Sequence, residues 1–273
     1  MRISDFSASL KYIDEVWYSE KVEGVSYPDD GSSIFFGVES RSLWFLNRNK
    51  LISEVVKEFL PSGPVFDIGG GNGFVSKAFL KQGLEYVLVE PSVDAVINAK
   101  KTGLKNIICS SFDNAGFLDN SLPAVGLFDV IEHIEDDVCF LKKISRALSV
   151  GGKLYLTVPT CNFLWSTFDV HFGHFRRYRI EEIIKKIEAV GLEVEFSSYF
   201  FFFFVFPIFL TRTIPSFFYR KSIKSSEGHV KQHNSGIILK KIVNFLFSAE
   251  IYFIKRKKNI PLGSSCIIVA TKK

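Results

Sequence analysis

Short apolar runs alternate with stretches of helical periodicity along most of the chain. The runs typical of buried strands cover residues 65–68, 86–90, 106–109, 124–128, 153–158 and 193–199. The segments with helical spacing between them cover residues 51–60, 74–81, 93–100, 136–148 and 180–190. Alternation of this kind with short connections predicts a mostly parallel sheet with helices on both faces.

Four segments with different predicted roles follow from this pattern. Residues 1–60 are predicted to form an N-terminal helical cap, and residues 61–199 an α/β core. A further apolar run at residues 264–271 is predicted to be the last core strand. Residues 261–273 would therefore rejoin the core sheet, after an inserted segment that covers residues 200–260. The predicted fold is therefore an α/β, Rossmann-like, seven-stranded and mostly parallel sheet, with the N-terminal cap and a C-terminal helical insertion before the last strand.

Phenylalanine is concentrated in the inserted segment, which opens with five consecutive Phe residues from Phe200. The apolar stretch 199–210 contains Pro207 and is too short to span a bilayer. Basic residues follow it, and a helix is predicted over 237–255. Such a segment suits the interface of a membrane without crossing it. The alternative is a helical lid or a dimer interface, which leaves a homo-oligomer open.

Charge is distributed unevenly along a chain whose net charge is +5. Residues 211–273 hold 13 Lys and Arg against two acids, a net +11, and the remainder is therefore −6. This basic segment indicates contact with an anionic lipid or nucleic acid, or else a solvated basic face. The four scattered cysteines and the absence of an apolar signal core near Met1 indicate a cytoplasmic protein, with peripheral attachment to the inner membrane face as an alternative.

A glycine-rich loop follows the first predicted core strand, in the order Asp67-Ile68-Gly69-Gly70-Gly71-Asn72-Gly73. Such a loop lets the backbone pass close to a ligand, although it also occurs as a plain tight turn. Asp67 disfavours a pyrophosphate, as in NAD, and suits an ammonium group. Glu90 ends the next strand, where a carboxylate can accept hydrogen bonds from both ribose hydroxyls.

This motif resembles the first motif of class I S-adenosylmethionine (SAM)-dependent methyltransferases, with Gly70 where many members have Cys. The resemblance covers roughly residues 40–200. It implies SAM as cofactor and S-adenosylhomocysteine (SAH) as product, with an NAD(P)-binding protein as the alternative. The cofactor residues that it implies are Asp67, Gly69, Gly71, Gly73, Glu90, Ser111, Phe112 and Asp129.

Polar residues end the fourth predicted strand, where the family places its groups near the transferred methyl. Asp129, Glu132 and His133 are the catalytic candidates. His133 is a candidate general base, because an imidazole titrates near neutral pH. The alternative is that Glu132 and His133 form a structural pair at the start of the next helix. In either case methyl transfer depends largely on positioning the nucleophile in line with the sulfonium.

A metal site is a further hypothesis for the same strand end. Asp129-x-x-Glu132-His133 is similar to the E-x-x-E-H pattern of metal-dependent small-RNA 2′-O-methyltransferases and of ubiquinone-pathway O-methyltransferases. Asp129 in place of the first Glu has a shorter reach. His174 stands where the small-RNA family has a further His. Asp129, Glu132, His133 and His174 would suit Mg²⁺ or Mn²⁺.

The segment after the fifth strand is rich in aromatic and basic residues and is predicted to recognise the substrate. It is similar to a subset of bacterial methyltransferases that accompany surface-glycan or lipid-linked sugar pathways, and Trp44 and Arg48 match the same subset. Core packing and a solvated helix start are the alternatives. The substrate candidates are Trp165, His171, His174, Arg176, Arg177, Tyr178, Trp44 and Arg48.

Three functional hypotheses follow. The first is methyl transfer, to oxygen, on a small-molecule, glycan or lipid-linked acceptor, with peripheral membrane contact. The second is metal-dependent RNA 2′-O-methylation, although the pattern does not favour nucleic acid as a partner. The third is a non-catalytic SAM-binding scaffold, against which the complete glycine motif and Glu90 argue.

Overall fold

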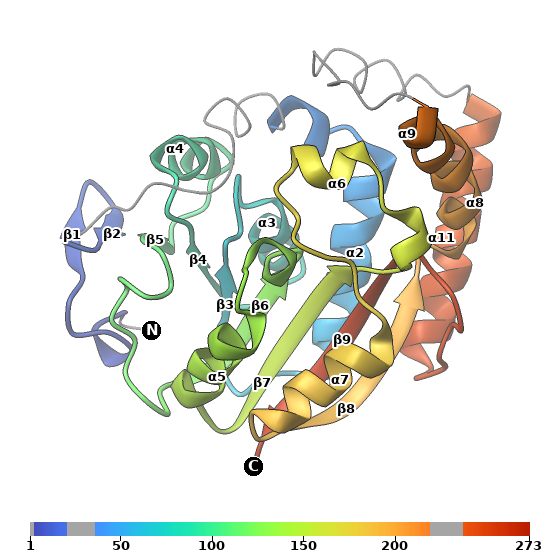
Figure 1. Ribbon diagram of the computed structural model, residues 1–273. Helices are drawn as coiled ribbons and strands as arrows, with labels where there is room; N and C mark the ends of the chain where they lie inside the picture. The colour runs from blue at the N-terminus through green and yellow to red at the C-terminus, as the bar shows by residue number, and fades with distance from the viewer. Residues whose placement is uncertain (1–2, 21–35, 219–236) are drawn as a thin grey trace.

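The computed structural model describes residues 3–20, 36–218 and 237–273 (Figure 1). One sheet runs through the molecule in the strand order β1-β2-β5-β4-β3-β6-β7-β9-β8. The strands are β1 (Lys11–Ile13), β2 (Val16–Tyr18), β3 (Val65–Ile68), β4 (Tyr86–Val89), β5 (Ile107–Cys109), β6 (Leu122–Phe128), β7 (Leu148–Pro159), β8 (Leu192–Phe200) and β9 (Ser265–Lys272). The five strands from β5 to β7 are parallel, and β9 runs antiparallel to both of its neighbours, β7 and β8.

The seven predicted core strands are all present, and the predicted fold class is confirmed. The number of strands is corrected, because the described residues contain nine strands in the sheet. The two additional strands, β1 and β2, form an antiparallel pair, and β2 lies parallel to β5 at the sheet edge. The segment 1–60 therefore differs from a wholly helical cap. Among its described residues, the long helix is confined to α2 (Leu43–Glu58).

Helices cover both faces of the sheet, as the strand–helix alternation predicts. The α-helices are α2, α3 (Phe74–Lys81), α4 (Val93–Lys101), α5 (Asp137–Ala147), α6 (Thr167–His171), α7 (Ile180–Ala189), α8 (Val205–Ile208), α9 (Ile214–Phe218) and α11 (Ile237–Lys255). Short 3₁₀ turns are η1 (Ile3–Asp5), η2 (Ile131–His133), η3 (Asn162–Leu164) and η4 (Phe202–Phe204), and η5 (Phe209–Thr213) is a π-helical turn. In Figure 1, α5 and α7 lie on one face of the sheet, and α2 and α11 on the other.

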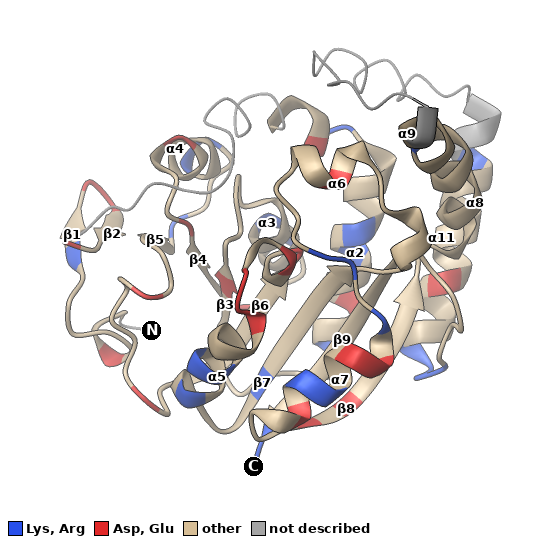
Figure 2. Cartoon of the chain, viewed as in Figure 1, with Lys and Arg blue, Asp and Glu red and all other residues tan. Residues whose placement is uncertain are grey.

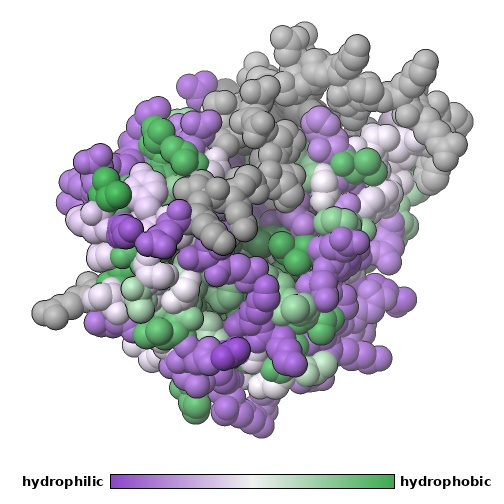
Figure 3. Space-filling model, turned by 60° about the vertical axis from the view of Figure 1, so that its left-hand side comes forward, coloured by the Kyte–Doolittle hydropathy of each residue, from purple (hydrophilic) through white to green (hydrophobic). Residues whose placement is uncertain are grey.

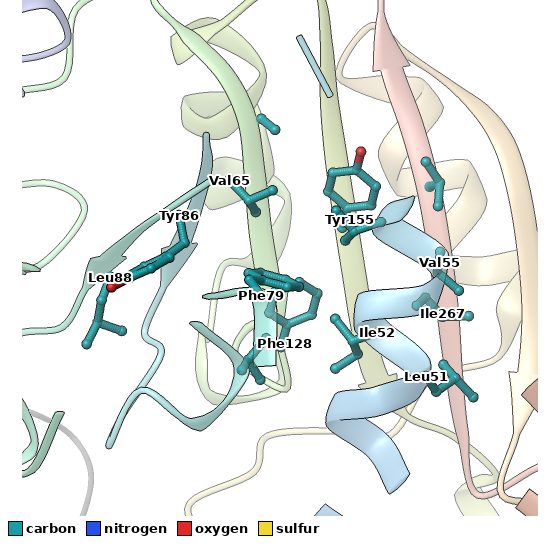
Figure 4. Close-up of a cluster of buried hydrophobic side chains, with 14 of the residues drawn as sticks. Leu51, Ile52, Val55, Val65, Phe79, Tyr86, Leu88, Phe128, Tyr155 and Ile267 are labelled. Carbon is teal, nitrogen blue, oxygen red and sulfur yellow. The ribbon is translucent and has the colours of Figure 1, made fainter. Parts of the chain in front are cut away.

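Two apolar layers follow from the alternation of side chains along each strand. On β3, Val65 packs with Ile52 and Phe79, in the layer beneath α2 and α3 (Figure 4), whereas Phe66 packs in the opposite layer with Ile144 and others from α5 and α7. The strands are apolar on both faces because both faces are covered, which is the expected state of a buried parallel sheet. This rigid core fixes the strand ends from which the site residues project.

The insertion between β8 and β9 is attached to the core by buried contacts. The carboxylate of Glu250, on α11, accepts hydrogen bonds from the backbone N–H groups of Phe201 (2.9 Å) and Phe202 (2.8 Å). Phe201 has a left-handed backbone and packs against Trp44 and Phe247. The insertion thus begins with a turn that α2 and α11 hold in place. Arg220, Lys221 and Lys224 of the predicted basic segment lie outside the described residues. None of the described helices has the length and apolar character needed to cross a membrane.

Candidate cofactor and active site

A cavity of about 1510 Å³ opens at the carboxyl ends of the parallel strands. Its walls come from the glycine loop after β3, from α2, from the segments after β4, β5, β6 and β7, and from the insertion. Ligands of open parallel sheets bind at this edge, because the loops that follow the strands gather there. Figure 3 shows a hollow on one face of the molecule, with apolar atoms inside it and hydrophilic residues along part of its edge.

The glycine loop leaves its backbone open to the cavity at Gly71. This residue has φ of +54°, and a Cβ added to it would meet no atom within 4 Å. Gly73 differs, because a Cβ there would lie 2.5 Å from Leu104, and Gly73 is not among the residues that line the cavity. We conclude that Gly71 leaves space for a ligand, whereas Gly73 allows helix α3 to pack closely.

Asp67 lies at the base of the cavity and is fully buried. Its Oδ2 accepts a hydrogen bond from the Ser76 hydroxyl at 2.8 Å, and its Oδ1 has no hydrogen-bond partner among the described residues. Burial raises the pKa of this carboxyl to about 6, and the Ser76 hydrogen bond and the charge of Arg48 lower it in part. A buried acceptor without a donor is costly, so the site is completed by a donor or a cation from a ligand.

Glu90 lies across the glycine loop from Asp67. Its carboxylate accepts hydrogen bonds from the backbone N–H groups of Gly71 (2.9 Å) and Ser92 (2.9 Å). Burial raises its pKa to about 7, and the charge of Asp67 contributes in the same direction. A carboxylate has lone pairs for more than two donors, so Glu90 retains acceptors for a pair of hydroxyl groups. Ser111 and Phe112 line the same cavity further along.

These features fit SAM on the basis of this structure alone. The Oδ1 atom of Asp67 suits the ammonium of the methionine part, and the open backbone at Gly71 gives the room. Glu90 suits the ribose hydroxyls, and Phe112 offers an apolar surface to adenine. Of the eight predicted cofactor residues, all except Gly73 line the cavity.

Asp129 is held by a buried arginine from α2. The Oδ2 atom of Asp129 accepts a hydrogen bond from the Nε of Arg48 at 2.7 Å and lies 2.6 Å from its Nη2. The Oδ1 atom accepts a hydrogen bond from the Thr157 hydroxyl at 3.2 Å. Asp129 has φ of +59°, in the left-handed region that a non-glycine residue rarely adopts. These bonds keep Asp129 in a strained turn at the centre of the cavity and occupy its carboxylate.

Glu132, His133 and His174 are brought together beside that turn. One ligand atom from each lies within 4.8 Å of the others. Both carboxylate oxygens of Glu132 are buried and without a hydrogen-bond partner among the described residues, and burial raises the pKa of this group well above its ordinary value. Burial, together with the neighbouring His174, lowers the pKa of His133 to about 4, so His133 is neutral at physiological pH. Asp129 is not part of this cluster, because it pairs with Arg48 instead.

Asp169 organises the loop that carries His174. Its buried carboxylate accepts from the Nε of Arg177 at 2.7 Å and lies 3.1 Å from the Nδ1 of His174. It also accepts from the backbone N–H and the hydroxyl of Ser166. Burial raises the pKa of Asp169, but His174 and Arg177 lower it by more and hold it below its ordinary value. The loop therefore presents His174 and Arg177 to the cavity in fixed positions.

The predicted substrate residues fall into two groups. Those that line the cavity are Trp44, Arg48, His174 and Arg177. Those that do not are Trp165, His171, Arg176 and Tyr178. Tyr178 is buried and donates to the carboxylate of Asp137 at 2.8 Å, and Arg176 pairs with the same carboxylate at 3.0 Å. The aromatic-basic pattern thus contains structural residues as well as cavity residues.

Sequence reasoning missed the contribution of the inserted segment to this site. Arg212, Phe203, Phe204 and Phe247 all line the cavity. From the sequence, Arg212 is only one of the basic residues that follow the phenylalanine run, and no role in the site is predicted for it. Its place in the cavity depends on how η5 packs against the loop after β7, and the local pattern carries no signal for such packing between distant segments.

Residues 66–156 match a family model described as "Methyltransferase domain". The matched segment holds the glycine loop, Glu90 and the strand end with Asp129, Glu132 and His133. These are the residues on which the resemblance to methyltransferases was based.

Curated relatives agree with this match over part of their length. A ubiquinone biosynthesis O-methyltransferase from Xanthomonas oryzae pv. oryzae (strain PXO99A) is 26% identical over 104 residues, 36% of this chain and 44% of the relative. An uncharacterised methyltransferase from Mycobacterium sp. (strain JLS) is 32% identical over 108 residues, 38% of this chain and 42% of the relative. The chain thus spans about half the length of the curated relatives that it matches.

Solved structures show the same fold over most of the chain. The [4+2]-cyclase SpnF has a TM-score of 0.56 at 17% identity and covers 92% of this chain and 99% of its own. Phosphoethanolamine N-methyltransferase 2 from Haemonchus contortus, in complex with phosphomonomethylethanolamine and SAH, has a TM-score of 0.54 at 18% identity. It covers 91% of this chain and 59% of its own. At these identities the likeness establishes the fold alone.

Over residues 66–156 the chain therefore matches a methyltransferase domain, which confirms the resemblance that the glycine loop and Glu90 indicate.

Proposed function

We propose that this protein transfers a methyl group from SAM to an oxygen atom of a small, glycan or lipid-linked acceptor. The observation that carries the proposal is the buried Oδ1 atom of Asp67, which lacks a donor among the described residues and belongs to the same cavity as the open backbone of Gly71. The sequence similarity to ubiquinone O-methyltransferases supports oxygen as the acceptor atom.

SAM supplies an electrophilic methyl on a sulfonium, and the bond to sulfur breaks as the bond to the acceptor oxygen forms. Asp67 and Glu90 hold the cofactor by its ammonium and its ribose, which fixes the direction of the methyl. Arg48 holds Asp129 against the same space, so the cavity is shaped before the acceptor enters. Most of the rate acceleration then comes from alignment of the acceptor oxygen with the methyl.

The acceptor hydroxyl must lose its proton during the transfer. His133 lines the cavity and is neutral, since its pKa lies at about 4, so one of its ring nitrogens can accept this proton. Its low pKa makes it a weak base, which is sufficient only when the proton moves as the new bond forms. A His133→Gln variant should keep the affinity for SAH and lose most of the turnover.

Calorimetric titration with SAH tests the cofactor assignment directly. Wild-type protein should bind SAH in the micromolar range, about −8 kcal/mol. Asp67→Asn should lower this affinity at least tenfold, because the amide offers no charge to an ammonium. Absence of SAH binding to folded wild-type protein would refute the proposal. Methyl transfer is then followed by incubating labelled SAM with lipid, glycan and small-molecule fractions.

Metal assistance is a second candidate, favoured by the two oxygens of Glu132, which have no partner among the described residues and lie beside His133 and His174. One carboxylate and two imidazoles fit Mn²⁺ better than Mg²⁺, which prefers oxygen ligands. A bound ion would act as a Lewis acid on the acceptor oxygen. Electron paramagnetic resonance of added Mn²⁺ reads out binding without activity. Wild-type protein should hold the ion and Glu132→Gln should release it; equal signals from both would contradict this candidate.

Peripheral membrane contact is supported by exposed aromatic side chains on the insertion. Phe206 is 66% exposed and Phe245 is 73% exposed, and Phe202, Phe203 and Phe253 are also exposed. Aromatic side chains of this kind insert at the lipid interface, where neighbouring basic residues attract anionic headgroups. Co-sedimentation with anionic vesicles should fall when Phe206 and Phe245 are both replaced by Ser. Equal pelleting of this variant and the wild type would count against membrane contact.

A further inference from the structure

Arg212 brings a positive charge into the cavity from the insertion. It lies on η5, which packs against the loop that follows β7. Ser216 accepts a hydrogen bond from the backbone N–H of Thr167 at 3.1 Å, and the rings of Phe163 and Phe209 are 6.1 Å apart. These contacts place Arg212 opposite the fixed loop. It lines the same cavity as Asp67 and His133.

The guanidinium of Arg212 has no acidic ion-pair partner within the described part of the chain. Its Cζ atom lies 4.2 Å from the centre of the Phe168 ring. It forms no ion pair or hydrogen bond through its side chain with any described residue. Burial lowers its pKa, and the charge of Arg177 lowers it further. Arginine remains charged under such conditions, so this is a partly desolvated cation without a paired anion in residues 3–20, 36–218 and 237–273.

Arg177 is the second cation at this position. Its Nε donates to Asp169 and its Nη1 to the backbone oxygen of Thr160 at 3.1 Å, so the side chain is rigid. Its Nη2 has no hydrogen-bond partner within the described part of the chain. Asp169, the ion-pair partner of Arg177, also accepts from Ser166 and lies 3.1 Å from His174, so its carboxylate is already occupied. Arg212 feels the charges of both Arg177 and Asp169, so the two guanidinium groups share one occupied carboxylate. Figure 2 shows the basic stretch of this loop between α6 and α7.

An apolar wall adjoins the two arginines. It is formed by side chains from η4, α8 and α11 that line the cavity: Phe203, Phe204, Ile208, Ile242, Leu246 and Phe247. Ile242 is 49% exposed and Phe203 is 41% exposed, so the wall reaches the surface. A ligand that satisfies both features has an anionic head beside an alkyl chain.

We propose that Arg212 and Arg177 bind a phosphate group of the acceptor and that the apolar wall takes an alkyl chain attached to it. This inference rests on the proposed function, since it names the acceptor of the same site. Planar guanidinium groups bind phosphate oxygens in pairs, which a hydroxyl-bearing neutral ligand cannot match. The insertion thus selects a phosphate-bearing amphiphile.

Binding of three probes to the SAH-loaded protein tests the proposal. Decyl phosphate carries both features, glycerol phosphate only the anion, and decyl glucoside only the chain; all are used below their micelle concentrations. Wild-type protein should bind decyl phosphate at least tenfold more tightly than either of the others. Equal affinity for decyl phosphate and decyl glucoside would overturn the phosphate site. Equal affinity for decyl phosphate and glycerol phosphate would retain the phosphate site and overturn the alkyl-chain assignment.

Variants separate charge from packing. Arg212→Met should weaken decyl phosphate at least tenfold and leave decyl glucoside unchanged, and Arg212→Lys should give an intermediate loss. Arg256→Met is the matched control, because Arg256 also lies 4.2 Å from an aromatic ring, that of Tyr252, but does not line the cavity. If Arg212→Met left decyl phosphate binding unchanged, the inference would fail. The SAH affinity of every variant is measured as well, and it tests the cofactor assignment independently of the phosphate site.

Discussion

The affinity for SAH should depend strongly on pH because both of its proposed carboxylate partners are buried. The pKa of Asp67 is raised to about 6 and that of Glu90 to about 7, in each case mainly by burial. Burial favours the neutral forms, whereas an ammonium and ribose hydroxyls favour the ionised forms. Binding therefore removes the protons that remain on these two groups.

The magnitude follows from the two pKa values. At pH 6 Asp67 is about half ionised and Glu90 about one tenth, so both are ionised in about one twentieth of the molecules. At pH 8 nearly all molecules have both groups ionised. The affinity should fall about 20-fold from pH 8 to pH 6, or about 1.8 kcal/mol. At pH 6 binding should release about 1.4 protons, because about half a proton remains on Asp67 and about nine tenths on Glu90.

Isothermal titration at pH 6, 7 and 8 measures the affinity, and repetition in buffers of different ionisation enthalpy counts the protons. Glu90→Gln is the control: it should bind SAH more weakly at pH 8 and show only about a twofold change between pH 8 and pH 6, from Asp67 alone. An affinity that is constant from pH 6 to pH 8, without proton release, would refute the reasoning. It would show that the two carboxylates are ionised before SAH arrives or do not contact it.

Three further predictions concern single residues. Gly71→Ala should lower SAH affinity at least tenfold, because the added Cβ would enter the space of the ligand. Gly83→Ala is the control, because Gly83 has φ of +72° and equally open surroundings but lies outside the cavity. Both variants should lose about 1 kcal/mol of stability in thermal melts, and Gly83→Ala should leave SAH affinity unchanged. Arg48→Met should lower the free energy of unfolding by about 3 kcal/mol in urea titrations, because it leaves Asp129 partly buried without its partner; an unchanged midpoint would contradict this. Glu250→Ala should cost about 1–3 kcal/mol by leaving the N–H groups of Phe201 and Phe202 unsatisfied, and hydrogen exchange at these two amides should rise while exchange in β3 remains slow.

The core could be predicted from the sequence because its signals are local. The strand Val65–Ile68 and the helix Phe74–Lys81 begin and end at the residues predicted from the sequence. Burial on both faces makes the core strands rich in apolar residues, which a local pattern reveals. The cofactor residues could also be predicted from local signals, because Asp67 lies one residue before the end of β3 and Glu90 directly follows the neighbouring strand β4. The short strands Lys11–Ile13 and Val16–Tyr18 carry no comparable pattern, and their pairing with β5 depends on distant sequence.

The acceptor side was harder to predict because it is built from contacts between distant segments. The sequence around Asp129 does not predict its ion pair with Arg48, which lies 81 positions earlier in the chain. The pattern that contains Arg176 and Arg177 does not show that one faces Asp137 and the other the cavity. Arg212 and Phe168 meet only through the packing of η5 against the loop after β7. Such contacts follow from the fold as a whole.

The place of β9 between β7 and β8 has a consequence for how this protein can change over evolutionary time. The inserted segment leaves the sheet at Phe200 and returns at Ser265, and these two residues are paired neighbours in adjacent strands. The segment is therefore topologically a long hairpin loop whose two ends are fixed side by side. Doubling the length of such a loop adds only about 0.6 kcal/mol of closure entropy. Lineages could exchange or lengthen this segment, and so change acceptors, while the cofactor half of the molecule stayed as it is.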